Sequence, residues 1–165
     1  TPGLIDLNTG LGLTEIKLVK KSQDRDARSA SPIRAAFRAE DSFNPHSPVI
    51  PVQRVAGITT AVSVPTGGLI SGTTTTHDLD GSAAPLAEHL VFRLGGIGDG
   101  SRGERFALLR EVVADARAFA RNPKAFITSP FRRSPASRLD LERLAETVKR
   151  PIFVFADRRA ECHLS

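Results

Sequence analysis

Two aspartates stand where α/β enzymes place their chemistry. Asp6 lies in the short apolar run 3–7, and Asp157 closes the apolar stretch "IFVFAD" at 152–157. Both runs predict strands, and the carboxyl ends of parallel strands gather at one edge of a sheet, where such enzymes bind substrates. We therefore take Asp6 and Asp157 as candidate catalytic residues. The alternative is that each carboxylate caps the turn after its strand.

Glycines cluster after another predicted strand. The segment 58–65, "ITTAVSVP", is β-branched and apolar and ends at a proline, which is typical of a strand buried on both faces. The loop that follows permits turns and a close approach to the backbone, and we predict that it binds substrate through Gly67, Gly68, Ser71 and Gly72. No G-x-S-x-G nucleophile elbow is present, so Ser71 is not assigned as a nucleophile.

One motif resembles a nucleotide loop. Residues 98–103, "GDGSRG", match G-x-G-x-x-G and precede a predicted helix. That helix leads to Asn122 and Pro123 rather than to a second strand with an acidic end, as a dinucleotide fold requires. We do not predict nucleotide binding.

The four histidines stand in no metal-binding spacing. His77 with Asp78 and Asp80 is the best local cluster, but it falls in a polar turn. Cys162 and His163 are adjacent, and adjacent side chains on a regular element point apart. No metal ligand is predicted.

The remaining segments alternate helices with strands. Proline and glycine signals or apolar periodicity predict helices at 32–41, 48–56, 103–121 and 137–150. A helix between buried strands indicates an α/β fold with parallel strands. The charged stretch 20–31 has nothing to bury and is predicted to be a mobile loop.

Charge and hydropathy limit the classes of partner that this chain is expected to bind. The net charge is +5, yet the basic residues are scattered among acidic ones, which argues against nucleic-acid binding. No apolar run approaches the length of about 18 residues that a membrane helix needs. We expect a small-molecule ligand and neither nucleic acid nor membrane.

Three stretches resemble a known family. "TPGLIDLNTGLGLTEI" resembles the first barrel strand of the amidohydrolase superfamily, which reads P-G-x-I-D-x-H-x-H. The stretch 41–81, with "NPHS", "GITT" and "PTGGLISG", resembles the imidazolonepropionase-like amidohydrolases. Residues 137–161 resemble the later helix-then-strand unit of that group.

The resemblance implies a TIM-like barrel in which zinc activates water to hydrolyse non-peptide C–N bonds. The positions at which the family carries histidine ligands hold Asn8, Gly10 and Phe155 here. We therefore expect no cofactor and a catalytically degenerate chain, a pseudoenzyme. With 165 residues it is too short to close eight strands, which takes about 250, so we expect one partial (β/α) barrel domain over 1–165.

Two other functions stay open. The first is a non-catalytic binding module that holds a small acidic ligand at the strand-end glycine loops. The second is an active hydrolase that uses Asp6 and Asp157 with His46 or His77. In every case the open sheet edges of a partial barrel favour self-association.

Overall fold

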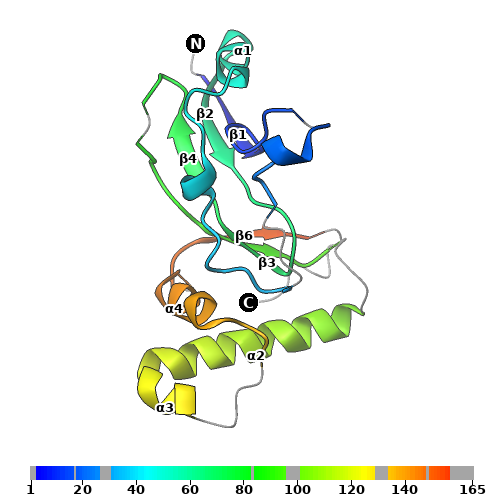
Figure 1. The fold of residues 1–165 in the computed structure, drawn as a ribbon, viewed down its shortest axis with the longest axis vertical. Helices are drawn as coiled ribbons and strands as arrows, with labels where there is room; N and C mark the ends of the chain where they lie inside the picture. Colours follow the sequence, from blue (N-terminus) through cyan, green and yellow to red (C-terminus); the bar gives the residue numbers. More distant parts are fainter. Residues whose placement is uncertain are drawn as a thin grey trace.

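The computed structural model describes residues 3–16, 18–26, 31–82, 84–95, 101–128, 134–147 and 149–156. Within them the chain forms two three-stranded sheets and four α-helices (Figure 1). The first sheet has the order β1-β2-β4 and the second the order β3-β5-β6. The strands are β1 (Leu4–Thr9), β2 (Ile58–Ser63), β3 (Ile70–Thr73), β4 (Thr75–Asp78), β5 (Leu90–Arg93) and β6 (Ile152–Phe155). The helices are α1 (Val49–Val55), α2 (Arg102–Arg121), α3 (Pro123–Thr128) and α4 (Arg138–Thr147), with 3-10 turns η1 (Lys20–Ser22) and η2 (Ala39–Ser42).

The expectation of parallel strands is confirmed only in part. β1 pairs with β2 and β5 with β6 in parallel, but β2–β4 and β3–β5 are antiparallel. The chain passes from the second sheet to the first across Thr74, because β3 ends at Thr73 and β4 begins at Thr75. The fold is mixed α/β, and its described strands form two small sheets rather than a barrel.

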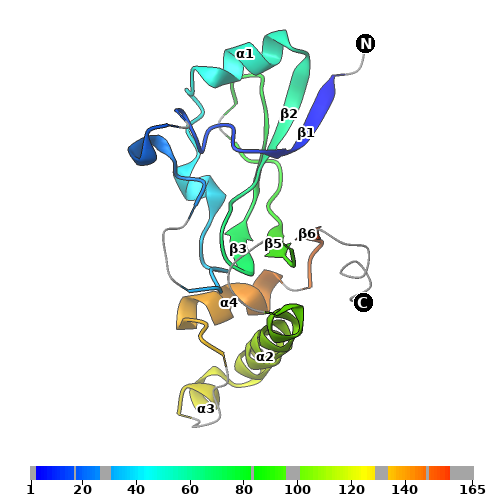
Figure 2. The same ribbon diagram turned by 90° about the vertical axis from the view of Figure 1, so that its right-hand side faces the viewer.

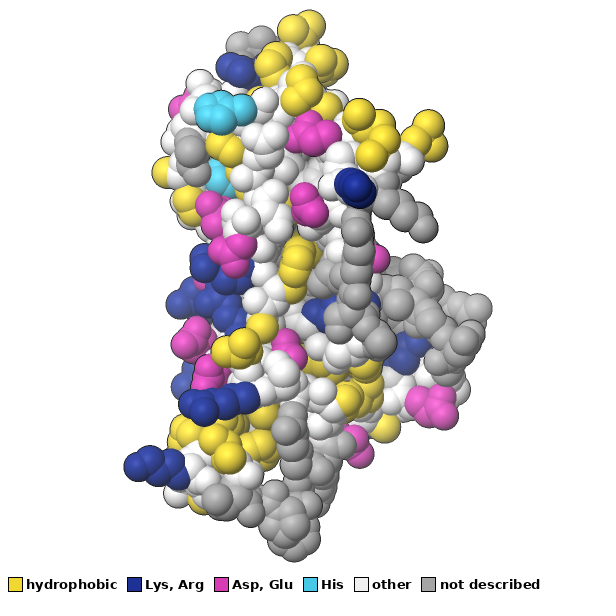
Figure 3. All heavy atoms as spheres, in the orientation of Figure 1, with side chains coloured by type: hydrophobic (Ala, Val, Ile, Leu, Met, Phe, Trp, Pro, Cys, Tyr) yellow, Lys and Arg dark blue, Asp and Glu magenta, His cyan; other side chains and the backbone are white. Residues whose placement is uncertain are grey.

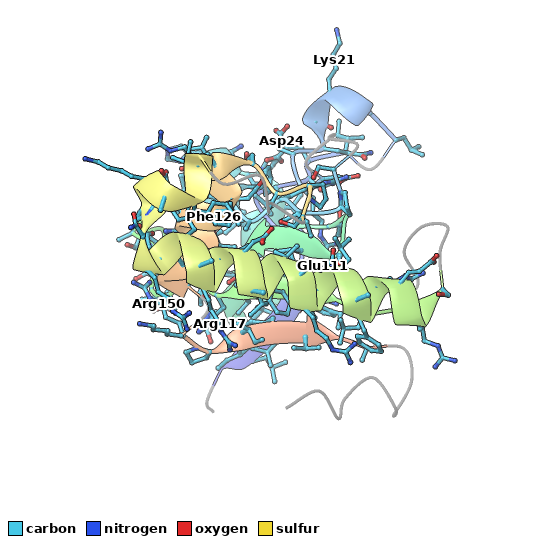
Figure 4. All side chains as sticks on the ribbon, turned by 90° about the horizontal axis from the view of Figure 1, so that it is seen from below. Lys21, Asp24, Glu111, Arg117, Phe126 and Arg150 are labelled. Carbon is cyan, nitrogen blue, oxygen red and sulfur yellow. The ribbon has the colours of Figure 1, made fainter. Side chains whose placement is uncertain are left out.

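Helices α2 and α4 cover one face of the second sheet (Figure 2). Their apolar side chains meet those of β3 and β5 in the largest core cluster, where Val112, Ala116 and Leu144 are almost fully buried. The short helix α3 packs on α2 through Phe126, whose ring lies edge-on to that of Phe119 at 5.9 Å between centroids (Figure 4).

The helix ends follow their sequence signals. Gly57 adopts φ +88° directly after α1, as expected of a glycine that ends a helix. At the start of α4 the Ser137 hydroxyl accepts from the Asp140 amide at 3.1 Å, and the Asp140 carboxylate accepts from the Ser137 amide at 2.9 Å. The predicted variant of the capping box is therefore confirmed. α2 begins with a full capping box between Ser101 and Glu104, which sequence analysis missed.

The helix predicted at 32–41 does not form, apart from the 3-10 turn η2. The chain instead runs beside β3, where Ile33 bridges Ile70 and Arg38 bridges Thr73. Ile33 and Ala35 are buried in the main core. The small and apolar residues of segment 32–41 can pack against the core from an extended chain as well as from a helix.

Part of the predicted mobile loop at 20–31 has local structure, namely η1 and a bridge between Thr14 and Gln23. Residues 27–30 lie outside the described residues, and the mobility stays a prediction. No helix in the described ranges is long and apolar enough to cross a membrane.

Runs as apolar as 3–7 and 152–157 are expected to form buried strands, and the structure contradicts this expectation. β1 is an edge strand, and Leu4, Ile5 and Leu7 are 63%, 61% and 57% exposed. β6 is the edge of the second sheet and leaves Ile152 and Val154 partly exposed. Further apolar side chains reach the surface around α1 and the turn after β1 (Figure 3). These strands are apolar as predicted, but the exposed side chains of both strands lack a covering element among the described residues, whereas Phe153 and Phe155 of β6 pack against the core.

Candidate functional site: a cationic strand-end cleft

The carboxyl ends of β1 and β2 lie side by side. Thr9 pairs with Ser63, and the Val64 amide donates to the Thr9 carbonyl at 2.9 Å. Asn8 and Gly10 therefore lie at the same sheet edge as the start of the loop after β2, as parallel pairing of these strands requires.

The side chain of Arg25 lies across the carboxyl ends of β1 and β2. Its Nε donates to the Val64 carbonyl at 2.7 Å, and its Nη2 donates to Asn8 Oδ1 at 3.1 Å. Its side chain also lies against Gly10, where an added Cβ would approach Arg25 Cδ to 3.0 Å. The absence of a side chain at Gly10 thus makes the room that Arg25 occupies.

A second arginine enters from the other sheet. Arg93 ends β5, and its Nη2 donates to the Pro65 carbonyl at 3.0 Å. Its guanidinium lies over the ring of Phe155, with Cζ 4.5 Å from the ring centroid, in cation–π geometry. Arg93 Nε is buried without a hydrogen-bond partner among the described residues.

The two guanidinium groups affect each other. Burial lowers the pKa of Arg25 below its ordinary value, and the charge of Asp6 partly offsets this. Burial also lowers the pKa of Arg93, and the positive charge of Arg25 lowers it further. Both shifts mean that the charged forms are less well solvated here than in water. The strand edge therefore brings two positive charges together, and Asp6 offsets them only in part.

Arg25 lines an open cleft of about 680 Å³. Its other lining residues include the polar side chains of Asn8, Thr9, Thr14, Glu15, Gln23, Asp26 and Thr66. Both acids of the cleft are engaged elsewhere. Glu15 accepts from Asn44 and Ser47, and Asp26 forms a 2.7 Å ion pair with Arg34.

Of the two predicted catalytic carboxylates, the structure places one. Asp6 is half-buried in β1, pairs in register with Ala61, and accepts from the Asn8 amide at 3.1 Å. This last bond lies within β1 rather than in a turn after it, so the catalytic and the turn-capping roles of Asp6 both stay predictions. Asp157 lies outside the described residues, as do Cys162, His163 and residues 98–100 of the 98–103 motif. Whether Asp6 and Asp157 meet stays open.

The glycines of the predicted substrate loop contact the chain itself. A Cβ on Gly68 would lie 2.7 Å from the Pro32 carbonyl oxygen, and a Cβ on Gly72 2.3 Å from the Phe37 carbonyl oxygen. Gly67 faces the ion pair of Arg34 and Asp26 in the same way. Segment 31–38 therefore fills the space beside this loop.

Ser71, the fourth residue of that prediction, is fully buried, and no partner for its hydroxyl lies in the described ranges. The three glycines are thus in packing contact with the chain itself, and Ser71 is buried. A substrate-binding role for them stays a prediction.

His77 belongs to a buried network rather than to a turn. Its Nε2 lies 2.8 Å from Thr75 Oγ1 and 3.2 Å from Glu40 Oε2, and its ring stacks on Phe43 at 3.7 Å. The Thr75 hydroxyl also bonds to Glu40. The network joins β4 to η2. His46 is exposed, and its backbone amide bonds to the Asn44 side chain.

Sequence analysis missed Arg25 and Arg93. Arg93 carried a usable signal, because it directly follows the apolar run Leu90–Phe92, and the rule that selected Asp6 applies to any polar residue at a strand end. Arg25 carried none. It comes from the charged stretch after β1, where it is one of many charged residues, and only tertiary structure brings it back to Asn8.

Zinc is the metal that the family resemblance implies, and the residues here do not fit it. The positions expected to hold imidazoles are Asn8, Gly10 and Phe155, and each of them contacts an arginine side chain. Guanidinium groups repel a dication, and an amide oxygen is a weak zinc ligand. No group of three or more His, Cys, Asp or Glu residues in the described part of the chain could hold a metal.

No protein-family profile matches the sequence, and no curated protein matches it. Among solved structures, an amidohydrolase from Thermotoga maritima matches with a TM-score of 0.77 and 17% identity, over 98% of this chain and 46% of that chain. The chain thus has an amidohydrolase-like fold and spans about half the length of that protein. At this identity the likeness concerns the fold alone.

Proposed function

We propose that this chain is related to the imidazolonepropionase-like amidohydrolases and has lost their zinc-dependent hydrolysis of non-peptide C–N bonds. One observation supports this above all. The three positions that would carry imidazole ligands have become contact sites for two arginines. The loss of the imidazole ligands and the presence of the arginine are connected, because Gly10 leaves the space for Arg25 and Asn8 accepts a hydrogen bond from it.

The proposal is tested by metal content and turnover. We expect purified protein incubated with zinc and then dialysed to hold well under one equivalent, measured by elemental analysis. We also expect no hydrolysis of a panel of amides, lactams and dipeptides. Stoichiometric zinc together with turnover that a chelator abolishes would overturn the proposal.

A gain-of-function experiment tests the stated cause. The triple variant Asn8→His, Gly10→His, Arg25→Ala restores two imidazoles and removes the neighbouring cation. It should bind zinc more tightly than the double variant Asn8→His, Gly10→His, which keeps Arg25. Equal affinity of the two variants would show that Arg25 does not oppose the metal.

A hydrolase that uses other groups is less well supported. Its named base, Asp6, already accepts from the Asn8 amide, and His77 is 1% exposed. If turnover is found, replacing Asp6 by Ala separates the cases, since an unchanged rate would exclude Asp6 from the chemistry.

A further inference from the structure

We propose that the cleft around Arg25 binds a small molecule through an oxyanion group, a carboxylate or a phosphate, with Arg93 supplying a second positive charge. This deepens the proposed function and rests on it in one respect, since a zinc ion bound beside Asn8 would displace Arg25.

Arg25 keeps unused donors for an oxyanion at the cleft, whereas Arg93 does not line the cleft and contributes through its charge. A guanidinium has five N–H donors in a planar fork that fits the two oxygens of a carboxylate or phosphate. Arg25 uses Nε and Nη2, both toward neutral acceptors, and Arg93 uses only Nη2. In the described structure Nη1 of Arg25 has no hydrogen-bond partner, and Arg25 is one of the residues that line the cleft.

The arginines are held in place by the protein itself. Their acceptors are consecutive carbonyls, Val64 for Arg25 and Pro65 for Arg93, so a single loop fixes both groups. Neither arginine forms an ion pair with a carboxylate among the described residues, in contrast to Arg34, Arg38 and Arg143. An anion would supply the countercharge that this edge lacks.

The cleft suits a small polar ligand. The hydroxyl groups of Thr14 and Thr66 and the amide of Gln23 line it beside Arg25. Its acids, Glu15 and Asp26, are bonded to other residues. The remaining nearby acid, Asp6, is bonded to the Asn8 amide and does not line the cleft.

The test is isothermal titration calorimetry of the full chain at fixed ionic strength, with inorganic phosphate in one arm and glutarate in the other. We expect saturable one-to-one binding of at least one probe, and the tighter probe identifies the oxyanion. Arg25→Gln should weaken that binding about tenfold or more, because it removes a charge-assisted contact. Arg93→Gln should weaken it less.

Two further variants keep the test decisive. Arg25→Lys retains the charge but not the planar fork, so it should remain folded by circular dichroism and still bind more weakly than wild type. Arg117→Gln removes an exposed arginine of α2 and should change nothing (Figure 4).

Dissociation constants above about 1 mM for both probes, or equal binding by wild type and Arg25→Lys, would overturn the proposal. The zinc assay is independent. Stoichiometric zinc refutes the loss of the metal reaction, whereas absent zinc with no anion binding refutes the oxyanion site alone.

Discussion

Asp140 offers the sharpest test of how the first and last parts of this chain hold together. Its buried carboxylate accepts from the Ser137 amide and hydroxyl at 2.9 and 2.6 Å, and from the Ala36 amide at 2.9 Å. Replacing Asp140 by Ala removes one half of the capping box of α4, the carboxylate that accepts from Ser137, which costs about 1 kcal/mol. It also leaves the Ala36 amide without its partner, which costs about 1–3 kcal/mol. Together these predict a loss of about 2–4 kcal/mol in the free energy of unfolding.

Urea unfolding followed by circular dichroism measures this loss, which should lower the midpoint by roughly 1–2 M. Glu142→Ala on the same helix is the matched control. That side chain is 38% exposed and pairs with Arg138 across one turn. Its removal should cost less than about 0.5 kcal/mol. If Asp140→Ala is no more destabilising than Glu142→Ala, the carboxylate does not tie segment 31–38 to α4, and the reasoning fails.

Two other sets of variants test the fold. Gly72→Ala should destabilise the protein by at least about 3 kcal/mol, since φ is +114° and the new Cβ would meet the Phe37 carbonyl. Gly57→Ala, also at positive φ but in open space, should cost only about 1 kcal/mol by the same unfolding assay, and equal losses would contradict the contact argument. We also propose self-association through the exposed edge β1. Leu7→Lys should then lower the sedimentation coefficient at high concentration, whereas Val55→Lys, on α1, should not. A wild-type chain that is monomeric at every concentration would exclude this.

Local signals predicted local structure well. The end of α1 at Gly57 and the start of α4 at Ser137 and Asp140 follow from single residues whose backbone preferences and side-chain bonds act within one turn. The positions of β1, β2 and β6 were also predicted, because β-branched or apolar runs such as 58–63 have few alternatives, whereas β3 lies in the segment predicted to be a loop. None of these inferences needed knowledge of a distant neighbour.

Burial and pairing direction could not be predicted in the same way. An apolar run indicates only that a strand could be buried on both faces. Ile5 and Leu7 belong to such a run and are nevertheless exposed. What covers a strand depends on other elements. The segment 32–41 shows the same limit, because the core contacts of Ile33 and Ala35 hold it extended where its composition favoured a helix.

One part of the candidate site could also be predicted from the sequence, and the other part could not. Asn8 and Gly10 could be recognised as substituted ligand positions, because a family resemblance supplied the expected residues. Their replacement by an arginine contact could not, since Arg25 is 15 residues beyond Gly10 and returns only through tertiary bonds to Asn8 and Val64.

The passage of the chain from β3 to β4 has a consequence for ligand binding. A single residue, Thr74, separates the two strands, and it is fully buried and bonded to His89 through its amide and its hydroxyl. So short and buried a link leaves the two sheets little freedom to move as separate bodies. Arg25 and Arg93, which come to the strand edge from opposite sides of this link, cannot move apart to relieve their repulsion. The proposed oxyanion site is thus preorganised at folding. A small anion should therefore bind it without a closing motion, with an association rate set by diffusion and electrostatic attraction.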